Sequence, residues 1–182
     1  MAARLLTAQL LALSGAALLA LSAVAATPHT TASAEPATWK ACHRSDVRAL
    51  RFIRVGQATL WRQSCTDEDL LSPPLRLEFR YFREVPGDAF AKAADNFLQR
   101  NLDDAAYQAL EARLAEFNSH YQDIDDGDSY TLTSRPDGTL QLALNNRQLT
   151  LQQGDDFARA YMTIWFGEQP YSRQLKRNLL GN

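Results

Sequence analysis

The sequence is short of several residue types, and each shortage narrows the functions that it supports. Among 182 residues there are three histidines and two cysteines. His29, His43 and His120 lie far apart and no Gly-x-Ser-x-Gly stretch is present, so the pattern gives no support to a Ser/His/Asp hydrolase. Cys42 beside His43 offers two adjacent ligands without a second pair, which disfavours zinc. We therefore expect neither a metal nor a cofactor.

Basic residues are not in excess either. The chain has 19 Lys and Arg against 21 Asp and Glu, a net charge of −2. Nucleic-acid binding requires a basic stripe that displaces counterions from phosphates, so we expect no nucleic-acid partner. The acidic run 123–128 departs from a calcium loop, because counting from Asp123 puts Asp128 at the glycine position and Ser134 at the glutamate position. A solvated turn is expected there.

Long apolar runs are confined to the N-terminus. Arg4 precedes the apolar run Leu10–Val24, and Ala23-Val24-Ala25 has the small-x-small pattern of a signal-peptide cleavage site. The run is too short for a stable membrane anchor. The predicted divisions are a signal peptide over 1–25, a flexible leader over 26–37 and one domain over 38–182. We expect a periplasmic or secreted protein cleaved near Ala25.

Export makes the two cysteines informative. An oxidising compartment favours a disulfide between Cys42 and Cys65. The chain-entropy model gives the loop closed by this bond roughly 3 kcal/mol of stabilisation. The alternative is a pair of free thiols.

Strand patterns and helix patterns alternate in blocks along the domain. Residues 75–85 alternate apolar and charged side chains, which predicts the clearest strand. Shorter strands are predicted at 39–41, 49–55, 58–61, 130–133, 139–144 and 148–151. The strands on either side of Gly56 form a hairpin or a bulged pair, and turns are predicted at 136–138 and 145–146. Helices are predicted at 88–100, from Asp103 or Asp104 to Tyr121, from Asp155 or Asp156 to Phe166, and after Pro170. This order predicts an α+β domain in which helices cover an antiparallel sheet.

Four stretches carry a family resemblance: FIRVGQATLW at 52–61, YFREVPGD at 81–88, GDSYTL at 127–132 and DFARAYMTIWFGEQPYSRQLKRNLLG at 156–181. In this order and spacing they resemble the chalcone isomerase-like family, in its bacterial exported branch. The resemblance implies an open-faced β-sandwich, with a ligand cleft between a large antiparallel sheet and a layer of helices. Plant enzymes of the family close a flavanone ring, and some other members bind fatty acids.

The polar residues that this resemblance implies are partly missing. Enzymes of the family place threonines where this chain has Gly56 and Ile164, and Thr163 points about 100° away from Ile164 on a helix. Losing positioned donors should strongly weaken ring-closing catalysis. The candidate ligand-binding residues are Arg44, Tyr81, Arg83, Asn96, Tyr161 and Trp165.

Three functions remain open on the sequence alone. The first is non-catalytic binding of a small apolar or amphipathic molecule, such as a fatty acid. The second is an intramolecular lyase or isomerase with an unknown substrate, and the third is an interaction protein that docks an envelope partner. The role of Arg83 is open in the same way: its guanidinium either binds a ligand carboxylate or forms a structural ion pair with Glu84 or Asp88.

Overall fold

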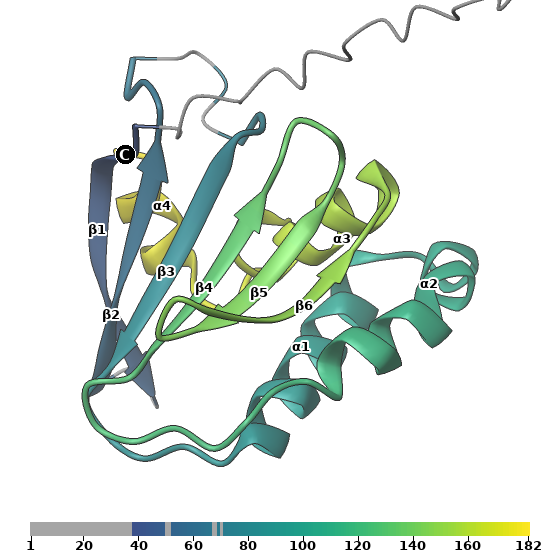
Figure 1. The fold of residues 1–182 in the computed structure, drawn as a ribbon, viewed down its shortest axis with the longest axis horizontal. Coiled ribbons are helices and arrows are strands. Elements are labelled where there is room, and N and C mark those ends of the chain that lie inside the picture. The colour runs from purple at the N-terminus through teal and green to yellow at the C-terminus, as the bar shows by residue number, and fades with distance from the viewer. Residues whose placement is uncertain (1–37, 50–51, 67–68, 70) are drawn as a thin grey trace, which may run out of the picture. The chain divides into compact units, whose positions relative to one another are not determined.

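The computed structural model describes residues 38–49, 52–66, 69 and 71–182, so the predicted signal peptide and leader lie outside the described residues. The described chain forms one six-stranded sheet and four helices. The elements are β1 (Lys40–Ala49), β2 (Ile53–Arg62), β3 (Leu75–Tyr81), α1 (Gly87–Asn101), α2 (Asp104–Asn118), β4 (Ser129–Ser134), β5 (Leu140–Leu144), β6 (Arg147–Gln152), α3 (Asp155–Phe166) and α4 (Arg173–Leu179). Every strand pairs antiparallel with its neighbour in the chain (Figure 1). The predicted α+β fold class is confirmed.

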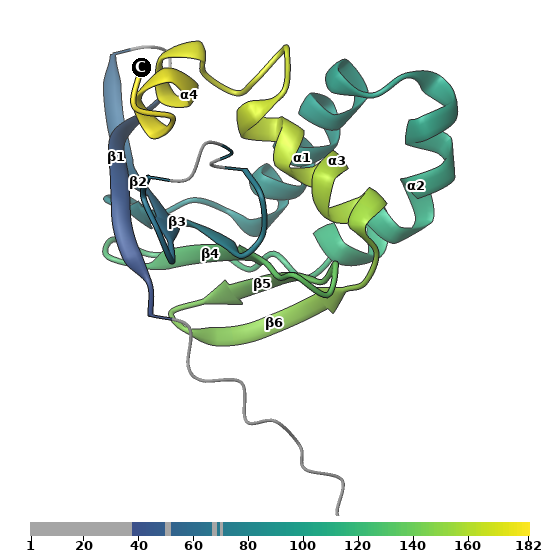
Figure 2. The same ribbon diagram turned by 90° about the horizontal axis from the view of Figure 1, so that it is seen from above.

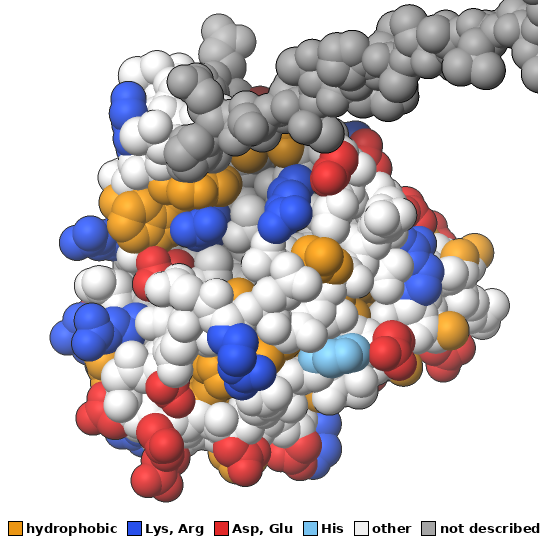
Figure 3. All heavy atoms as spheres, viewed as in Figure 1, with side chains coloured by type: hydrophobic (Ala, Val, Ile, Leu, Met, Phe, Trp, Pro, Cys, Tyr) orange, Lys and Arg blue, Asp and Glu red, His pale blue; other side chains and the backbone are white. Residues whose placement is uncertain are grey.

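The helices cover one face of the sheet, as Figure 2 shows. In β3 the apolar side chains Leu75, Leu77 and Phe79 are buried beneath these helices, and the charged residues between them lie on the opposite face. Figure 3 shows that outer face, where basic and acidic side chains are interspersed. The alternating pattern of the sequence therefore separates a helix-covered core from a polar surface.

The first two strands differ from the prediction. No hairpin turn occurs at Gly56, because β2 runs through this residue. The alternative of a bulged strand pair is closer to the structure, since the register of β2 against β1 shifts between Val47 and Arg48, next to Gly56. Gly56 pairs with Tyr81 of β3, and a Cβ atom at Gly56 would lie 2.4 Å from the carbonyl oxygen of Arg80. The glycine thus permits a close approach of two strands.

The third strand is shorter than predicted. It ends at Tyr81 because the chain bends there toward α1. The Phe82 amide donates to the Val55 carbonyl at 2.9 Å, and Val85 forms only an isolated bridge with Ile124. This bend places the two residues after β3 at the boundary between the sheet and the helical layer.

The helix starts follow the sequence in part. Asp103 caps α2, since its side chain accepts a hydrogen bond from the Ala106 amide at 2.8 Å, as predicted. Gly154 is the N-cap residue of α3, so the prediction that Asp155 or Asp156 caps this helix is wrong; both lie in its first turn. Within the described part of the chain, no helix has the length and apolar composition required to cross a bilayer.

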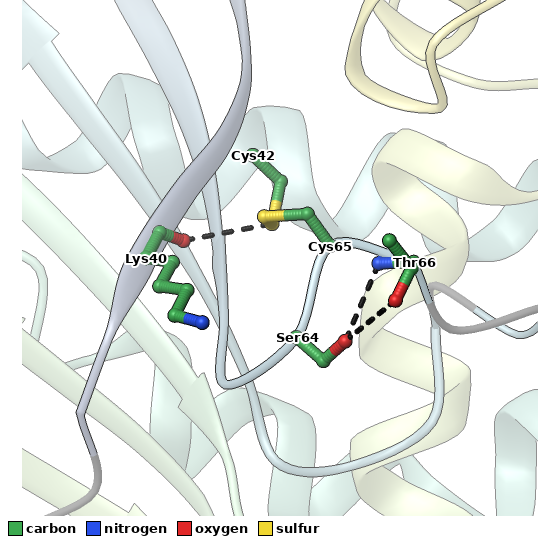
Figure 4. Close-up of a disulfide and its surroundings, with 5 residues drawn as sticks. All are labelled: Lys40, Cys42, Ser64, Cys65 and Thr66. Atoms are coloured by element: carbon green, nitrogen blue, oxygen red, sulfur yellow. Dashed lines mark hydrogen bonds between the residues drawn. A yellow bond between two sulfur atoms is a disulfide. The ribbon is translucent and has the colours of Figure 1, made fainter.

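The predicted disulfide between Cys42 and Cys65 is confirmed (Figure 4). It links β1 to the loop that follows β2, with the two Cα atoms 5.3 Å apart. The bond fastens the start of the sheet's edge strand to the neighbouring loop.

Candidate ligand cavity

A cavity of about 350 Å³ lies between the sheet and the helices α1 and α3. The strands β1 to β4 and the β3–α1 connection contribute one side of it, and the two helices contribute the other. Its walls are apolar or aromatic. Arg83 is the single charged residue among the described residues that line it, and no serine or threonine of the described chain lines it.

Packed aromatic rings form one wall of this cavity. Phe90 of α1 contacts Tyr81, Tyr121 and Tyr130, with ring centroids 5.2, 5.5 and 5.1 Å apart. Tyr121 and Tyr130 also meet edge to face at 5.1 Å. Such ring pairs prefer specific geometries, so they hold the helix and the sheet at a fixed separation. The wall is therefore preformed rather than assembled by a ligand.

Two polar groups at the cavity have no partner in the described chain. The Tyr81 hydroxyl makes no hydrogen bond, and the Arg83 guanidinium makes neither a hydrogen bond nor an ion pair with the described residues. The predicted alternative of a pair with Asp88 is not present, because Asp88 pairs with Lys92 at 2.6 Å. Burial raises the pKa of Tyr81 well above its ordinary value, so its hydroxyl stays protonated and is a hydrogen-bond donor.

Other tyrosine hydroxyls at the cavity are engaged within the protein. Tyr130 exchanges hydrogen bonds with the backbone amide and carbonyl of Gln122, both at 2.7 Å. The Tyr121 hydroxyl lies 3.0 Å from that of Tyr161, which donates to Asn118 Oδ1 at 2.7 Å. Burial raises the pKa of Tyr121 and of Tyr161, so this network is neutral. These hydroxyls position the cavity wall and leave Tyr81 and Arg83 available to a ligand.

The structure brings half of the predicted site residues together. Tyr81, Arg83 and Trp165 line the cavity, and Arg44, Asn96 and Tyr161 are not among the residues that line it. Arg44 pairs with Thr59 in a row of the sheet that faces away from the helices. Asn96 is exposed on α1. Tyr161 is fully buried behind the cavity, where it supports Tyr121.

Sequence reasoning missed the contribution of small side chains. Ala89, Ala93 and Ala94 of α1 line the cavity, as does Ala49 of β1. Alanine has no functional group that marks a ligand site. The one signal was that Ala94 falls on the same face of the predicted helix as Phe90 and Phe97. Small residues opposite large rings leave space that larger side chains would fill.

The helix α3 presents an apolar residue to the cavity at the position where the sequence resemblance implies a threonine in the enzymes. Ile164 lines the cavity. The Thr163 hydroxyl instead donates to the Ala160 carbonyl at 2.6 Å, and Thr163 lines a separate hollow on the other side of α3. The cavity is thus suited to holding an apolar molecule near one cation rather than to polarising a substrate at several points.

Comparisons with known proteins agree with this geometry. No curated protein sequence matches the chain significantly. The crystal structure of an Arabidopsis thaliana fatty-acid binding protein is similar, with a TM-score of 0.52 and 14% sequence identity, and the match covers 80% of this chain and 90% of that one. At this identity the likeness shows a shared fold. The chalcone isomerase-like family model matches residues 47–181, so the chain belongs to the chalcone isomerase-like family.

Proposed function

We propose that this protein binds an amphipathic carboxylic acid, such as a fatty acid, and does not transform it. The observation that carries the proposal is an apolar cavity lined by two donors, Tyr81 and Arg83, that have no partner among the described residues. A guanidinium offers a planar fork of N–H groups that matches a carboxylate, and a neutral tyrosine adds one further donor. The ligand head group therefore lies at Arg83.

The hydrocarbon part of the ligand occupies the space between the aromatic rings and the alanines of α1. A volume of about 350 Å³ is at the small end of ligand cavities, which suits a single chain rather than a fused ring system. Burial of each CH₂ group contributes about 0.8 kcal/mol, so affinity should rise with chain length until the cavity is filled. The fatty-acid binding protein with the same fold supports this ligand class.

We also propose that the protein is exported and acts in the periplasm or outside the cell. The signal-peptide pattern over residues 1–25 and the Cys42–Cys65 disulfide both support an oxidising compartment. Intact mass spectrometry of the protein from the envelope fraction should give a chain that begins near Ala26. A chain that retains Met1 in the cytosolic fraction would contradict export.

The ligand is tested first by native mass spectrometry of protein purified without detergent. A mass excess that matches a fatty acid supports binding. Displacement of a fluorescent fatty acid by dodecanoate and by dodecanol then separates the head group from the tail. Arg83→Gln should weaken dodecanoate about tenfold or more and leave dodecanol unchanged, since a hydrogen bond to a charged group contributes about 1.5–3 kcal/mol.

The matched control is Arg80→Gln, because Arg80 is an exposed arginine of β3 on the outer face of the sheet. It removes the same charge without touching the cavity. Equal losses of dodecanoate binding in the two variants would assign the effect to net charge and contradict a head-group role for Arg83. Tyr81→Phe should cause a smaller loss than Arg83→Gln.

A further inference from the structure

Two of the three exposed large apolar side chains of the described chain are adjacent, at the end of the β1–β2 hairpin. Phe52 is 83% exposed and the adjacent Ile53 is 41% exposed. Exposure of two adjacent apolar side chains to water is unfavourable, and their burial against a partner surface would lower the free energy. Nothing in the core requires them, since neither belongs to the buried cluster.

Arginines surround this apolar pair. Arg48 and Arg54 share a single carboxylate, that of Asp46, at 3.1 and 2.8 Å. The Arg54 guanidinium also lies over the Phe82 ring, 4.7 Å from its centroid. Arg83 follows Phe82 and has no partner among the described residues. This end of the sheet thus carries the guanidinium groups of Arg48, Arg54 and Arg83. The Asp46 carboxylate pairs with the first two, and Glu84 follows Arg83 in the chain.

The same end of the hairpin adjoins the mouth of the cavity. Ile53 pairs with Ala49, and the Phe52 amide donates to the Ala49 carbonyl at 3.2 Å. Ala49, Val55 and Arg83 all line the cavity. In Figure 1 this end of β1 and β2 lies beside the point where β3 leaves the sheet. A surface held against the hairpin would therefore also adjoin the cavity opening.

We propose that Phe52, Ile53, Arg48 and Arg54, here named the hairpin tip, dock this protein on an anionic membrane surface. The apolar pair enters the boundary between head groups and acyl chains, and the arginines contact lipid phosphates. Each arginine near an anionic surface contributes about 1 kcal/mol, and the apolar pair adds the free energy of burial. A second copy of the chain fits this surface less well, because self-association would bring like charges together.

Docking provides a direct route for an amphipathic ligand between the bilayer and the cavity. This transfer step rests on the proposed ligand binding, whereas docking itself does not. Arg83 then lies between the membrane surface and the apolar cavity, where it receives the carboxylate as the hydrocarbon chain enters. Delivery through bulk water, in which long-chain acids are poorly soluble, is not required.

The test is sedimentation of the mature, disulfide-bonded protein with ligand-free vesicles. Vesicles of equimolar phosphatidylcholine and phosphatidylglycerol should bind it at low salt, and high salt or pure phosphatidylcholine should weaken binding. Phe52→Ser with Ile53→Ser should reduce the binding constant about tenfold or more. The control is Leu151→Ser, which removes an exposed side chain of β6 with 42% exposure, and it should retain full binding.

Three results would overturn the proposal. The first is a protein that fails to bind the anionic vesicles, and the second is an equal loss in the Leu151→Ser control. The third is a concentration-dependent dimer that disappears in the Phe52→Ser, Ile53→Ser variant, which would assign the hairpin tip to self-association. Fatty-acid displacement in vesicle-free solution is measured in parallel, so a failure of docking is distinguishable from a failure of ligand binding.

Discussion

Replacing Ala94 by leucine tests whether the cavity is open space in solution. Ala94 is 4% exposed on α1 and lines the cavity. Leucine adds three carbon atoms, which occupy only part of about 350 Å³. Their burial contributes about 2 kcal/mol at 0.8 kcal/mol for each group, and the lost rotamer freedom of leucine offsets about 0.5–1 kcal/mol. We therefore expect Ala94→Leu to raise the free energy of unfolding by about 1–2 kcal/mol.

The matched control is Ala160→Leu. Ala160 is also a buried helical alanine, 7% exposed on α3, and it lines none of the described cavities. The same three atoms have no space there, so overpacking should lower the free energy of unfolding by about 1–3 kcal/mol. The two substitutions share their helix propensities and differ in the sign of the expected change.

Urea denaturation, followed by circular dichroism, measures the free energy of unfolding of both variants. The values are comparable if the m-values of the variants equal that of the unmodified protein. Dodecanoate at a hundred times its dissociation constant should stabilise the unmodified protein by about 2.7 kcal/mol, and this shift should be smaller in Ala94→Leu, where the leucine side chain occupies part of the cavity. If Ala94→Leu destabilises the protein as much as Ala160→Leu does, the space is filled in solution. The ligand-binding proposal would then lose its structural basis.

Three further outcomes follow from the buried groups and the disulfide. Tyr161→Phe leaves Asn118 Oδ1 without its buried donor, so the free energy of unfolding should fall by about 1–3 kcal/mol in urea denaturation. Replacing Cys42 and Cys65 by serine should lower it by about 3 kcal/mol, and an unchanged urea midpoint would show that the bond constrains nothing. Because burial raises the pKa of Tyr81 in the folded state, only the unfolded chain releases this proton just above pH 10. The contribution of Tyr81 to stability should thus be constant between neutral pH and about pH 9 and fall as the pH rises through 10, as denaturation at stepped pH would measure.

The sequence predicts the parts of the fold that depend on local side-chain patterns, such as the buried face of a strand or a tight turn. The alternation in β3 identifies its buried face because one side of the sheet is covered by helices. Asn145 and Asn146 adopt φ angles of 50° and 65°, which few residues other than asparagine and glycine tolerate, so the turn between β5 and β6 is evident from the sequence. The hairpin alternative at Gly56 was wrong because glycine also permits the close approach of a neighbouring strand, and the approaching residue, Arg80, is distant in sequence.

Among the predicted site residues, too, those in a strong local pattern line the cavity, and the one that depends on strand register does not. Tyr81 and Arg83 were predicted within a motif at the end of a strongly patterned strand, and both line the cavity. Arg44 was selected by its distance from a motif, and a shift of one position along a strand moves a side chain to the opposite face of the sheet. Its register opposite Thr59 places it on the outer face. Spacing along the chain carries no information on that register.

The end of β3 explains why the cavity has a polar mouth. Had β3 continued to Val85, the ladder would have alternated Tyr81, Arg83 and Val85 on the helical face, with a charged residue in the core. The bend after Tyr81 instead brings Arg83 to the solvent boundary, where it remains hydrated without a partner among the described residues. The Arg83 guanidinium could be buried at the cavity only together with an anion that neutralises its charge. This position is consistent with the proposed role of Arg83 in binding a ligand carboxylate, and the Arg83→Gln and Arg80→Gln comparison tests that role against structural support.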